Sequence, residues 1–302
     1  MNAPAENQRR EKAERLLEIL DLESIEQNLY RGLNEVRGNF RLFGGQVLSQ
    51  ALRGAYRTIE DRNVHSVHAY FMRAGDAAIP VLYEVDRIRD GRGFATRRVV
   101  AIQNGEAIFS MSASFQIQED GFEHADLMPN VPLPDELEDD LVVASRALES
   151  GDGLRHRGLS PMAGRPRPFE MRSVFPLGSD IWAQNRFFSP VWIRFSLPLP
   201  DDDQSLARCV LAYASDMGLV STALLPHAQS VPRDEVQMAS LDHSLWIHRP
   251  VPVNEWLLFH KHTSTAGGSR GLVHGEFYSE RGELLASVTQ EGLIRHTGGA
   301  AS

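Results

Sequence analysis

The most constraining feature of this 302-residue chain is an internal repeat near the ends of its two halves. Residues 105–117 read Gly-Glu-Ala-Ile-Phe-Ser-Met-Ser-Ala-Ser-Phe-Gln-Ile, and residues 282–294, starting 177 residues later, read Gly-Glu-Leu-Leu-Ala-Ser-Val-Thr-Gln-Glu-Gly-Leu-Ile. Such self-similarity predicts two tandem copies of one fold. Ala113 aligns with Gln290, so the copies differ chemically there and any chemistry should be asymmetric.

Each copy is predicted to contain one long helix followed by an antiparallel meander, which is an α+β unit with the helix on one sheet face. The first helix follows Phe43-Gly-Gly, and the second runs from about 205 to 225. Asn104-Gly105 is a strong hairpin signal. The predicted strands cover 64–73, 81–90, 94–103 and 107–117, then 237–248, 256–263, 271–279 and 284–295.

The predicted organisation places these units between less regular segments. We expect an N-terminal helix in 1–22, a first repeat in 23–118 and a second repeat in 166–297. A linker rich in proline and acidic residues, with one short helix near 139–148, should occupy 119–165, and 298–302 should be a tail.

Composition excludes several classes of protein. A hydrophobic content of 42% and a charged content of 24% are those of a soluble globular chain. A net charge of −9 argues against a nucleic-acid partner. The start has no signal-peptide core and we find no run of 18 apolar residues, so no membrane partner is expected. The single cysteine, Cys209, excludes an intrachain disulfide, and a cytoplasmic location is the simplest inference.

Polar residues on predicted apolar faces mark a candidate site. Asp216 falls within the apolar stripe of the 205–225 helix, and Gln290 lies among aliphatic neighbours on the last strand. Ser240 shares a predicted strand face with Met238, Asp242, Ser244 and Trp246. Burying such groups is costly unless they are paired. Their convergence would suit activation of water by a carboxylate, and the alternative is a buried network that only fixes packing.

Other motifs favour structural roles. Gly267-Gly-Ser-Arg-Gly271 matches a nucleophile-elbow pattern, but the following residues alternate as a strand and not as the required helix. His260-Lys-His262 lacks a third ligand at suitable spacing, so we expect exposed strand histidines and no metal. His65 is expected to line the core or a substrate pocket. Gly44 and Gly45 begin a helix whose free N–H groups could face a substrate carbonyl or could simply permit a tight turn.

Seven short motifs together resemble the acyl-CoA thioesterase II family, in family order from about Leu22 to His296. They are Phe43-Gly-Gly-Gln-Val47, His65-Ser-Val-His-Ala-Tyr-Phe-Met-Arg73, Arg97-Arg-Val-Val-Ala-Ile-Gln-Asn-Gly105, Tyr213-Ala-Ser-Asp216, Leu241-Asp-His-Ser-Leu-Trp246, Asn254-Glu-Trp-Leu257 and Gln290-Glu-Gly292.

The resemblance implies a double hotdog fold, in which each antiparallel sheet wraps around its helix. It also implies hydrolysis of acyl-CoA to a fatty acid and coenzyme A without a cofactor or metal, by a catalytic trio that falls on Asp216, Ser240 and Gln290. The family often has threonine at the position of Ser240. Gly44, Gly45 and His65 are expected to contact the acyl-CoA substrate.

A homo-oligomer, either a dimer or a tetramer, is expected by resemblance. Two other functions stay open at this point: a non-catalytic acyl-CoA-binding hotdog module and an enoyl-CoA hydratase-type hotdog. The retained acid, hydroxyl and amide argue against the first, and the hydratase would need a paired Asp and His in one copy.

Overall fold

The computed structural model describes residues 3–35, 41–149, 164–175, 179–200, 202–228 and 230–298. Its centre is a sheet of 13 strands in which neighbouring strands are antiparallel. The first half contains, in spatial order, β1 (Glu23–Glu26), β2 (Leu29–Gly32), β4 (Val81–Asp90), β5 (Phe94–Gln103), β6 (Glu106–Gln116) and β3 (Asn63–Phe71). The second half continues with β10 (Asp242–Ile247), β13 (Leu284–His296), β12 (Arg270–Ser279), β11 (Leu257–Gly267), β8 (Val191–Phe195) and β7 (Phe169–Ser173), while β9 (Val236–Ser240) pairs with β13.

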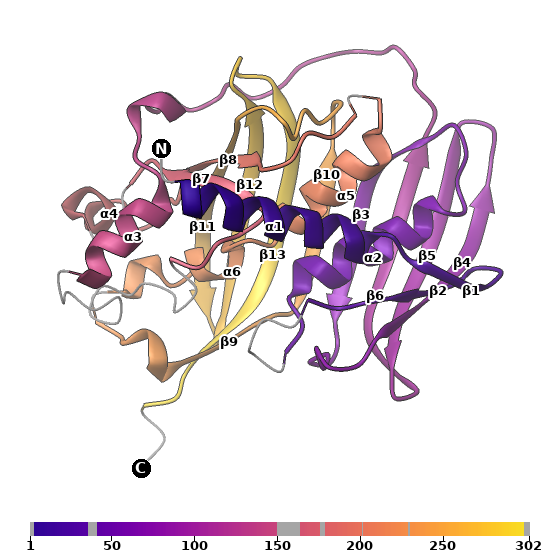
Figure 1. Ribbon diagram of the computed structural model, residues 1–302, viewed down its shortest axis with the longest axis horizontal. Helices are drawn as coiled ribbons and strands as arrows, with labels where there is room; N and C mark the ends of the chain where they lie inside the picture. Colours follow the sequence, from indigo (N-terminus) through magenta and orange to yellow (C-terminus); the bar gives the residue numbers. More distant parts are fainter. Residues whose placement is uncertain are drawn as a thin grey trace.

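The two halves are joined where β3 pairs with β10, with Val67 opposite Leu245. Helix α2 (Gly44–Tyr56) belongs to the first half and α5 (Gln204–Ser215) to the second. The two helices pack against each other on one face of the sheet (Figure 1). This arrangement confirms the predicted double hotdog fold. Arg53 near the end of α2 donates a hydrogen bond to Ser205 near the start of α5, so the two helices run antiparallel. The beginning of α2 therefore lies beside the end of α5.

Helix α1 (Ala3–Leu20) crosses in front of α2 (Figure 1) and buries Leu16, Ile19 and Leu20. It lies within the predicted N-terminal segment 1–22. The linker contributes α3 (Asp140–Glu149), close to its predicted position, and a further short helix, α4 (Asp180–Gln184), follows β7. The parts of the predicted linker and tail at 150–163 and 299–302 lie outside the described residues.

The prediction of a single helix over 205–225 is wrong, because the helix is interrupted after Ser215. Helix α5 ends at Ser215, Asp216 is its C-cap, and Gly218 adopts φ 71°. A residue with left-handed backbone dihedrals cannot continue a right-handed α-helix, and glycine adopts that conformation without steric cost. The chain then resumes as the short helix α6 (Leu219–Thr222), so Asp216 lies at a helix end and not in mid-helix.

The chain has no unbroken run of 18 apolar residues, but the segment Gln204–His227 is long and apolar enough on average to cross a membrane by length and composition. It includes the central helix α5, and 72% of its most apolar window is buried inside the fold. A core helix meets the same criterion, and α5 is one.

The predicted strand over 237–248 is likewise two strands, separated at Leu241. Leu241 donates to the Glu291 carbonyl at 3.0 Å and accepts from Phe71 at 2.9 Å, so the chain leaves β9 and enters the β3–β10 pairing there. The break shifts the side-chain alternation by one residue. Ser240 faces the helices, whereas Ser244 and Trp246 lie on the opposite face with His68. The expectation of one shared face was therefore wrong.

Two tight turns have the backbone that the sequence signals require. Asn104 and Gly105 have φ 52° and 76° between β5 and β6. Gly268 and Ser269 have φ 55° and 61° between β11 and β12, so the nucleophile-elbow pattern forms a hairpin turn.

Candidate active site

The Asp216 carboxylate accepts hydrogen bonds from one helix and two strands. Its Oδ2 accepts the Gly45 backbone N–H of α2 at 2.7 Å. Its Oδ1 accepts the Gln290 Nε2 of β13 at 2.9 Å and the Ser240 hydroxyl at the end of β9 at 3.4 Å. The structure thus brings together Asp216, Ser240, Gln290 and the Gly44-Gly45 turn, although 171 residues separate Gly45 from Asp216.

The glycines allow the two helix ends to approach this closely. A Cβ on Gly44 would lie 2.8 Å from Asp216 Oδ2, and one on Gly45 would lie 2.6 Å from the Tyr213 carbonyl oxygen. Contacts under 3.0 Å force something to move, and in the second case the obstacle is backbone. The Gly-Gly pair is therefore required for contact between the start of α2 and the end of α5.

The environment of Asp216 moves its pKa upward. Burial raises the pKa of the Asp216 carboxyl from 3.8 to about 6, while the hydrogen bonds from Gln290, Gly45 and Ser240 oppose that rise. A carboxyl with this pKa is ionised near neutral pH and is a stronger base than an exposed aspartate.

His243 lies behind the trio and was not predicted as part of the site. It is fully buried, and its Nε2 is 2.9 Å from the hydroxyl of Ser215, the residue that precedes Asp216. Burial lowers the pKa of His243 to about 4, so the ring is neutral near pH 7. The strand break at Leu241 turns His243 inward, which sequence alternation could not reveal.

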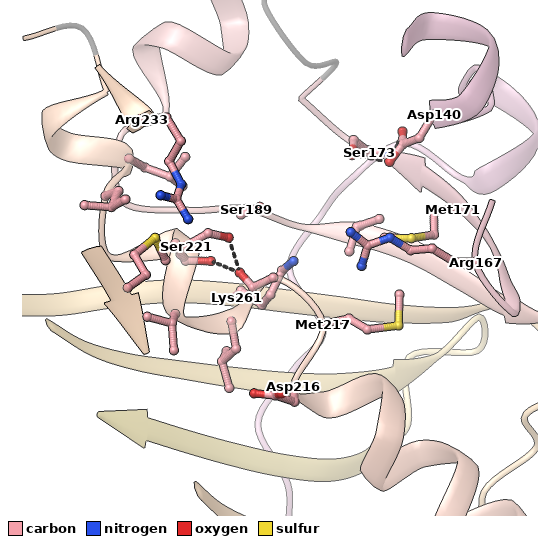
Figure 2. Close-up of a pocket in the computed structure, with 18 of the residues that line it drawn as sticks. Asp140, Arg167, Met171, Ser173, Ser189, Asp216, Met217, Ser221, Arg233 and Lys261 are labelled. Carbon is pink, nitrogen blue, oxygen red and sulfur yellow. Dashed lines mark hydrogen bonds between the residues drawn. The ribbon is translucent and has the colours of Figure 1, made fainter. Parts of the chain in front are cut away.

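A cavity of about 570 Å³ borders the trio, and Asp216 and Ser240 form part of its wall. Figure 2 shows Asp216 at one side of this space, with Lys261, Arg167 and Arg233 around the remainder. Part of the remaining wall is apolar, including Met217, Val220 and Met238, and part is polar or acidic, including Ser173 and Asp140. The cavity therefore combines a buried base, an apolar wall and cationic groups.

Lys261 is the second functional candidate that sequence reasoning missed. It is buried, and this burial, together with the charge of Arg167, lowers its pKa to about 8, while Asp140 opposes the change. Its position between His260 and His262 on β11 was the available signal, because strand alternation directs it to the opposite face from both histidines.

The structure does not bring His65 to Asp216. Its Nε2 is 2.8 Å from the Ser114 hydroxyl and its ring contacts Phe94 edge-on, all within the first repeat. His65 is not among the residues that line the cavity.

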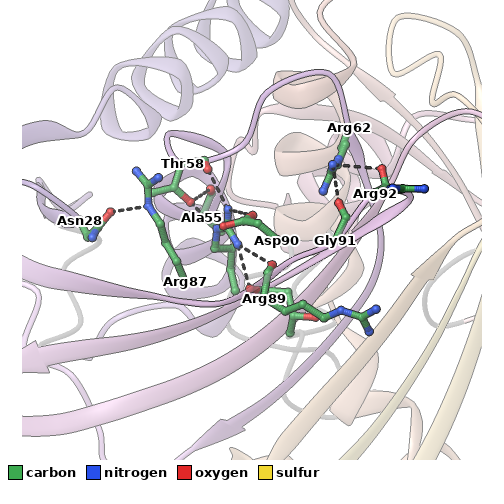
Figure 3. Close-up of polar contacts among 11 residues, drawn as sticks. Asn28, Ala55, Thr58, Arg62, Arg87, Arg89, Asp90, Gly91 and Arg92 are labelled. Atoms are coloured by element: carbon green, nitrogen blue, oxygen red, sulfur yellow. Dashed lines mark hydrogen bonds and ion pairs between the residues drawn. The ribbon is translucent and has the colours of Figure 1, made fainter.

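The matching position of the first copy has different chemistry, as the alignment of Ala113 with Gln290 predicted. Ala113 is buried opposite Arg97 on β5, and the Arg97 guanidinium is buried as well. That guanidinium donates to the Thr58 hydroxyl at 2.8 Å and to Asp90 at 2.6 Å, and it also donates to the carbonyls of Thr58, Arg89 and Thr96. Figure 3 shows three of these partners, Thr58, Arg89 and Asp90. Every N–H donor of Arg97 is thus engaged, and a methyl group stands where the second copy has the Gln290 amide.

Two family models match the chain. One described as acyl-CoA thioesterase matches residues 183–293, and one described as acyl-CoA thioesterase N-terminal domain matches residues 36–116. Together they cover both copies of the repeat.

Individual proteins are similar over nearly the whole chain. The chain is 41% identical to acyl-coenzyme A thioesterase 8 of Mus musculus over 287 residues, which covers 92% of this chain and 88% of the mouse protein. It is 37% identical to acyl-CoA thioesterase 2 of Haemophilus influenzae, with 93% and 96% covered. The crystal structure of an acyl-CoA thioesterase II from Mycobacterium marinum superposes with a TM-score of 0.75 at 40% identity, with 95% and 100% covered.

Proposed function

We propose the following catalytic roles on the premise that this chain belongs to the acyl-CoA thioesterase family and hydrolyses acyl-CoA thioesters. Asp216 acts as the general base that activates water, and Gln290 and Ser240 hold its carboxylate. The observation that carries this proposal is the buried carboxylate on the cavity wall, with hydrogen bonds from Gly45, Gln290 and Ser240.

The proposed reaction has two steps. Water attacks the thioester carbonyl carbon while Asp216 accepts one of its protons, giving a tetrahedral oxyanion. The intermediate then collapses, the carbon–sulfur bond breaks, and the Asp216 proton passes to the departing thiolate. The products are a carboxylic acid and the free thiol of coenzyme A, and the carboxylate is regenerated.

The developing oxyanion needs hydrogen-bond donors or a positive field. We assign the Gly45 N–H to holding Asp216, because it already donates to Oδ2. The N-terminal end of α2, which begins at Gly44, supplies partial positive charge beside the same carboxylate. We therefore propose that the first turn of α2 also faces the oxyanion.

The cavity suits the two parts of a fatty acyl-CoA. The cationic side chains of Lys261, Arg167 and Arg233 complement the phosphates of coenzyme A. Met217, Val220 and Met238 offer apolar contacts to the acyl chain near Asp216. We propose a fatty acyl-CoA as the substrate on this basis.

The proposed steps use protein groups and water alone, so hydrolysis is proposed to need no cofactor. We further propose a cytoplasmic location, in keeping with the single, buried cysteine, and self-association of the chain. The sheet face away from the helices exposes large apolar side chains such as Tyr70 and Leu82, which supports a protein contact there.

The test of the function is release of coenzyme A thiol from short, medium and long acyl-CoAs by the purified chain. We expect thiol release that saturates with substrate and is fastest for one range of chain lengths. Binding of acyl-CoA without thiol release would favour a binding module. Loss of crotonyl-CoA absorbance without thiol release would favour a hydratase.

A further inference from the structure

Three metal-binding side chains meet on the sheet face that points away from α2 and α5. His260 and His262 project from β11 on this outer face, on either side of the inward-facing Lys261. Glu276 of β12 lies directly opposite His260 in the strand register. The expectation that His260 and His262 lack a third ligand therefore fails, because the register supplies a carboxylate 16 residues further along the chain.

The ligand atoms have the separations that an ion requires. His260 Nδ1 is 3.3 Å and His262 Nδ1 is 4.0 Å from Glu276 Oε2, and the three ligand atoms lie within 4.8 Å of one another. Bonds of roughly 2.0–2.1 Å at a tetrahedral angle place ligand atoms about 3.3–3.4 Å apart. The pair His260 Nδ1 and Glu276 Oε2 already has this spacing. A small rotamer change would move His262 Nδ1 to the same distance from Glu276 Oε2.

A bound ion would provide a partner for the Nδ1 atom of His262. Its Nδ1 is buried, and among the described residues it has no hydrogen-bond partner. A buried polar atom without a partner is unfavourable, and coordination would remove the deficit. Its nearest oxygen in the cluster, Glu276 Oε2, already bonds to His260 Nδ1.

Neighbouring rings fix the orientation of both histidines. Phe188 stacks on His260 with ring centroids 5.6 Å apart, and His274 stacks on His262 at 5.1 Å. Both nitrogens of His274 lie near hydroxyls, those of Ser264 at 3.0 Å and Thr289 at 3.2 Å, so His274 forms a wall of the cluster. The side chains of His260, His262 and Glu276 remain 18–32% exposed, which leaves an approach for an ion.

We propose that His260, His262 and Glu276 form a binding site for a divalent transition-metal ion of the zinc type. Two imidazoles and one carboxylate suit Zn²⁺ and its neighbours, whereas Ca²⁺ and Mg²⁺ prefer oxygen ligands alone. Three protein ligands leave a fourth position for water or another donor. The ion would join β11 to β12 on the face opposite the cavity, so its role is separate from hydrolysis.

The test is titration of the metal-free, full-length protein with Zn²⁺, followed by calorimetry. We expect one ion per chain and a higher melting temperature in its presence. His260→Asn/His262→Asn should abolish this binding, and Glu276→Gln should weaken it by at least about tenfold, the loss that even an outer-shell change produces. His68→Asn is the matched control, because His68 lies on the same outer face but bonds to Ser244.

Two results would overturn the proposal. One is the absence of saturable Zn²⁺ binding to the wild-type protein. The other is equal binding by wild type, the double variant and Glu276→Gln, which would assign the ion to other residues. Circular dichroism of each metal-free variant shows whether it folds, and Glu276→Gln, with its near-identical shape, tests the site if the double variant does not fold. Thiol release, measured in parallel, reports separately on hydrolysis.

Discussion

The Asp216 carboxylate lies between two helix ends with opposite effects. It caps the C-terminal end of α5, where the helix dipole disfavours negative charge, and it receives a hydrogen bond from the first turn of α2, where the dipole favours it. Burial then dominates and raises the pKa to about 6. The result is a base that is ionised at neutral pH yet holds a proton more strongly than an exposed aspartate.

This pKa predicts the pH dependence of hydrolysis. The base must be unprotonated, so kcat/KM should be maximal above the pKa of Asp216 and should fall as pH drops through about 6. A pH profile with a stable acyl-CoA measures the midpoint. A midpoint near 4, typical of an exposed aspartate, would contradict the proposed environment.

Gln290 and Ser240 should contribute unequally. Gln290 is fully buried and donates at 2.9 Å, whereas the Ser240 contact is long, at 3.4 Å. Gln290→Ala should lower kcat roughly 10–100-fold, the worth of a hydrogen bond to a charged group, and Ser240→Ala should lower it less than about tenfold.

The pH profile distinguishes this positioning role from general damage. Each hydrogen bond lowers the pKa of Asp216, so Gln290→Ala should move the midpoint upward more than Ser240→Ala does. Ser240→Thr keeps the hydroxyl and should retain activity. Equal losses in both alanine variants, with unmoved midpoints, would contradict the ranking.

At the residue scale, burial of polar groups predicted much of the candidate site. Asp216 and Gln290 stood out because each interrupts an apolar face. In the structure, Gln290 Nε2 lies 2.9 Å from Asp216 Oδ1. His243, Lys261 and Glu276 did not stand out, because their roles depend on which face a strand presents and which residue lies opposite. Strand register is set by tertiary pairing, so spacing in one strand cannot reveal it.

At the element scale, the contact between α2 and α5 positions the catalytic carboxylate. Gly45 supplies both the closest approach and the hydrogen bond to Asp216. Another glycine of the same helix, Gly54, has room, since the nearest atoms to an added Cβ would be 3.6 Å away. The two glycines therefore form a matched pair for testing.

Gly45→Ala should destabilise the protein by about 1–3 kcal/mol, as overpacking does, and should lower kcat because α2 must move from Asp216. Gly54→Ala should instead stabilise it by about 0.5–1 kcal/mol, because alanine favours a helix interior over glycine. Thermal unfolding and thiol release measure both effects. Similar melting temperatures for the two variants would show that close helix contact is not the constraint.

Element types were easier to predict than element ends. Hydrophobic periodicity located the central helices and most of the strands, but two of its elements are interrupted in the structure. Gly218 ends the predicted long helix through its positive φ, and Leu241 divides a predicted strand by changing its pairing partner. Both breaks border Asp216 or Ser240, where tertiary contacts override the local pattern.

At the scale of the whole molecule, the two copies share a fold but have separate chemical roles. The position of Gln290 is Ala113 in the first copy, and the strand register places the buried Arg97 opposite it. The repeat and the differing residue were visible in the sequence. The network around Arg97 was not, since its partners come from the turn after α2, from β4 and from its own strand β5.

Because the two copies have separate chemical roles, we predict that Arg97 of the first copy supports the fold and not the reaction. Arg97→Leu should lower the free energy of unfolding by about 1–3 kcal/mol, because the carbonyls of Thr58, Arg89 and Thr96 lose a donor. Activity below the melting temperature should be unchanged. Arg98→Leu, at the exposed neighbouring position, is the control and should change stability by less than about 0.5 kcal/mol. Equal effects of the two substitutions in chemical denaturation would contradict this assignment.

The most direct measurement is the turnover of acyl-CoA by Asp216→Asn beside Asp242→Asn. Asp242 lies near Ser240 in sequence, but among the described residues its side chain accepts only the Glu291 backbone N–H. We predict that Asp216→Asn folds normally and loses about 10²–10⁴-fold in kcat, the usual contribution of a general base, while Asp242→Asn stays close to wild type. Near-native turnover by a folded Asp216→Asn protein would contradict the assignment of Asp216 as the base.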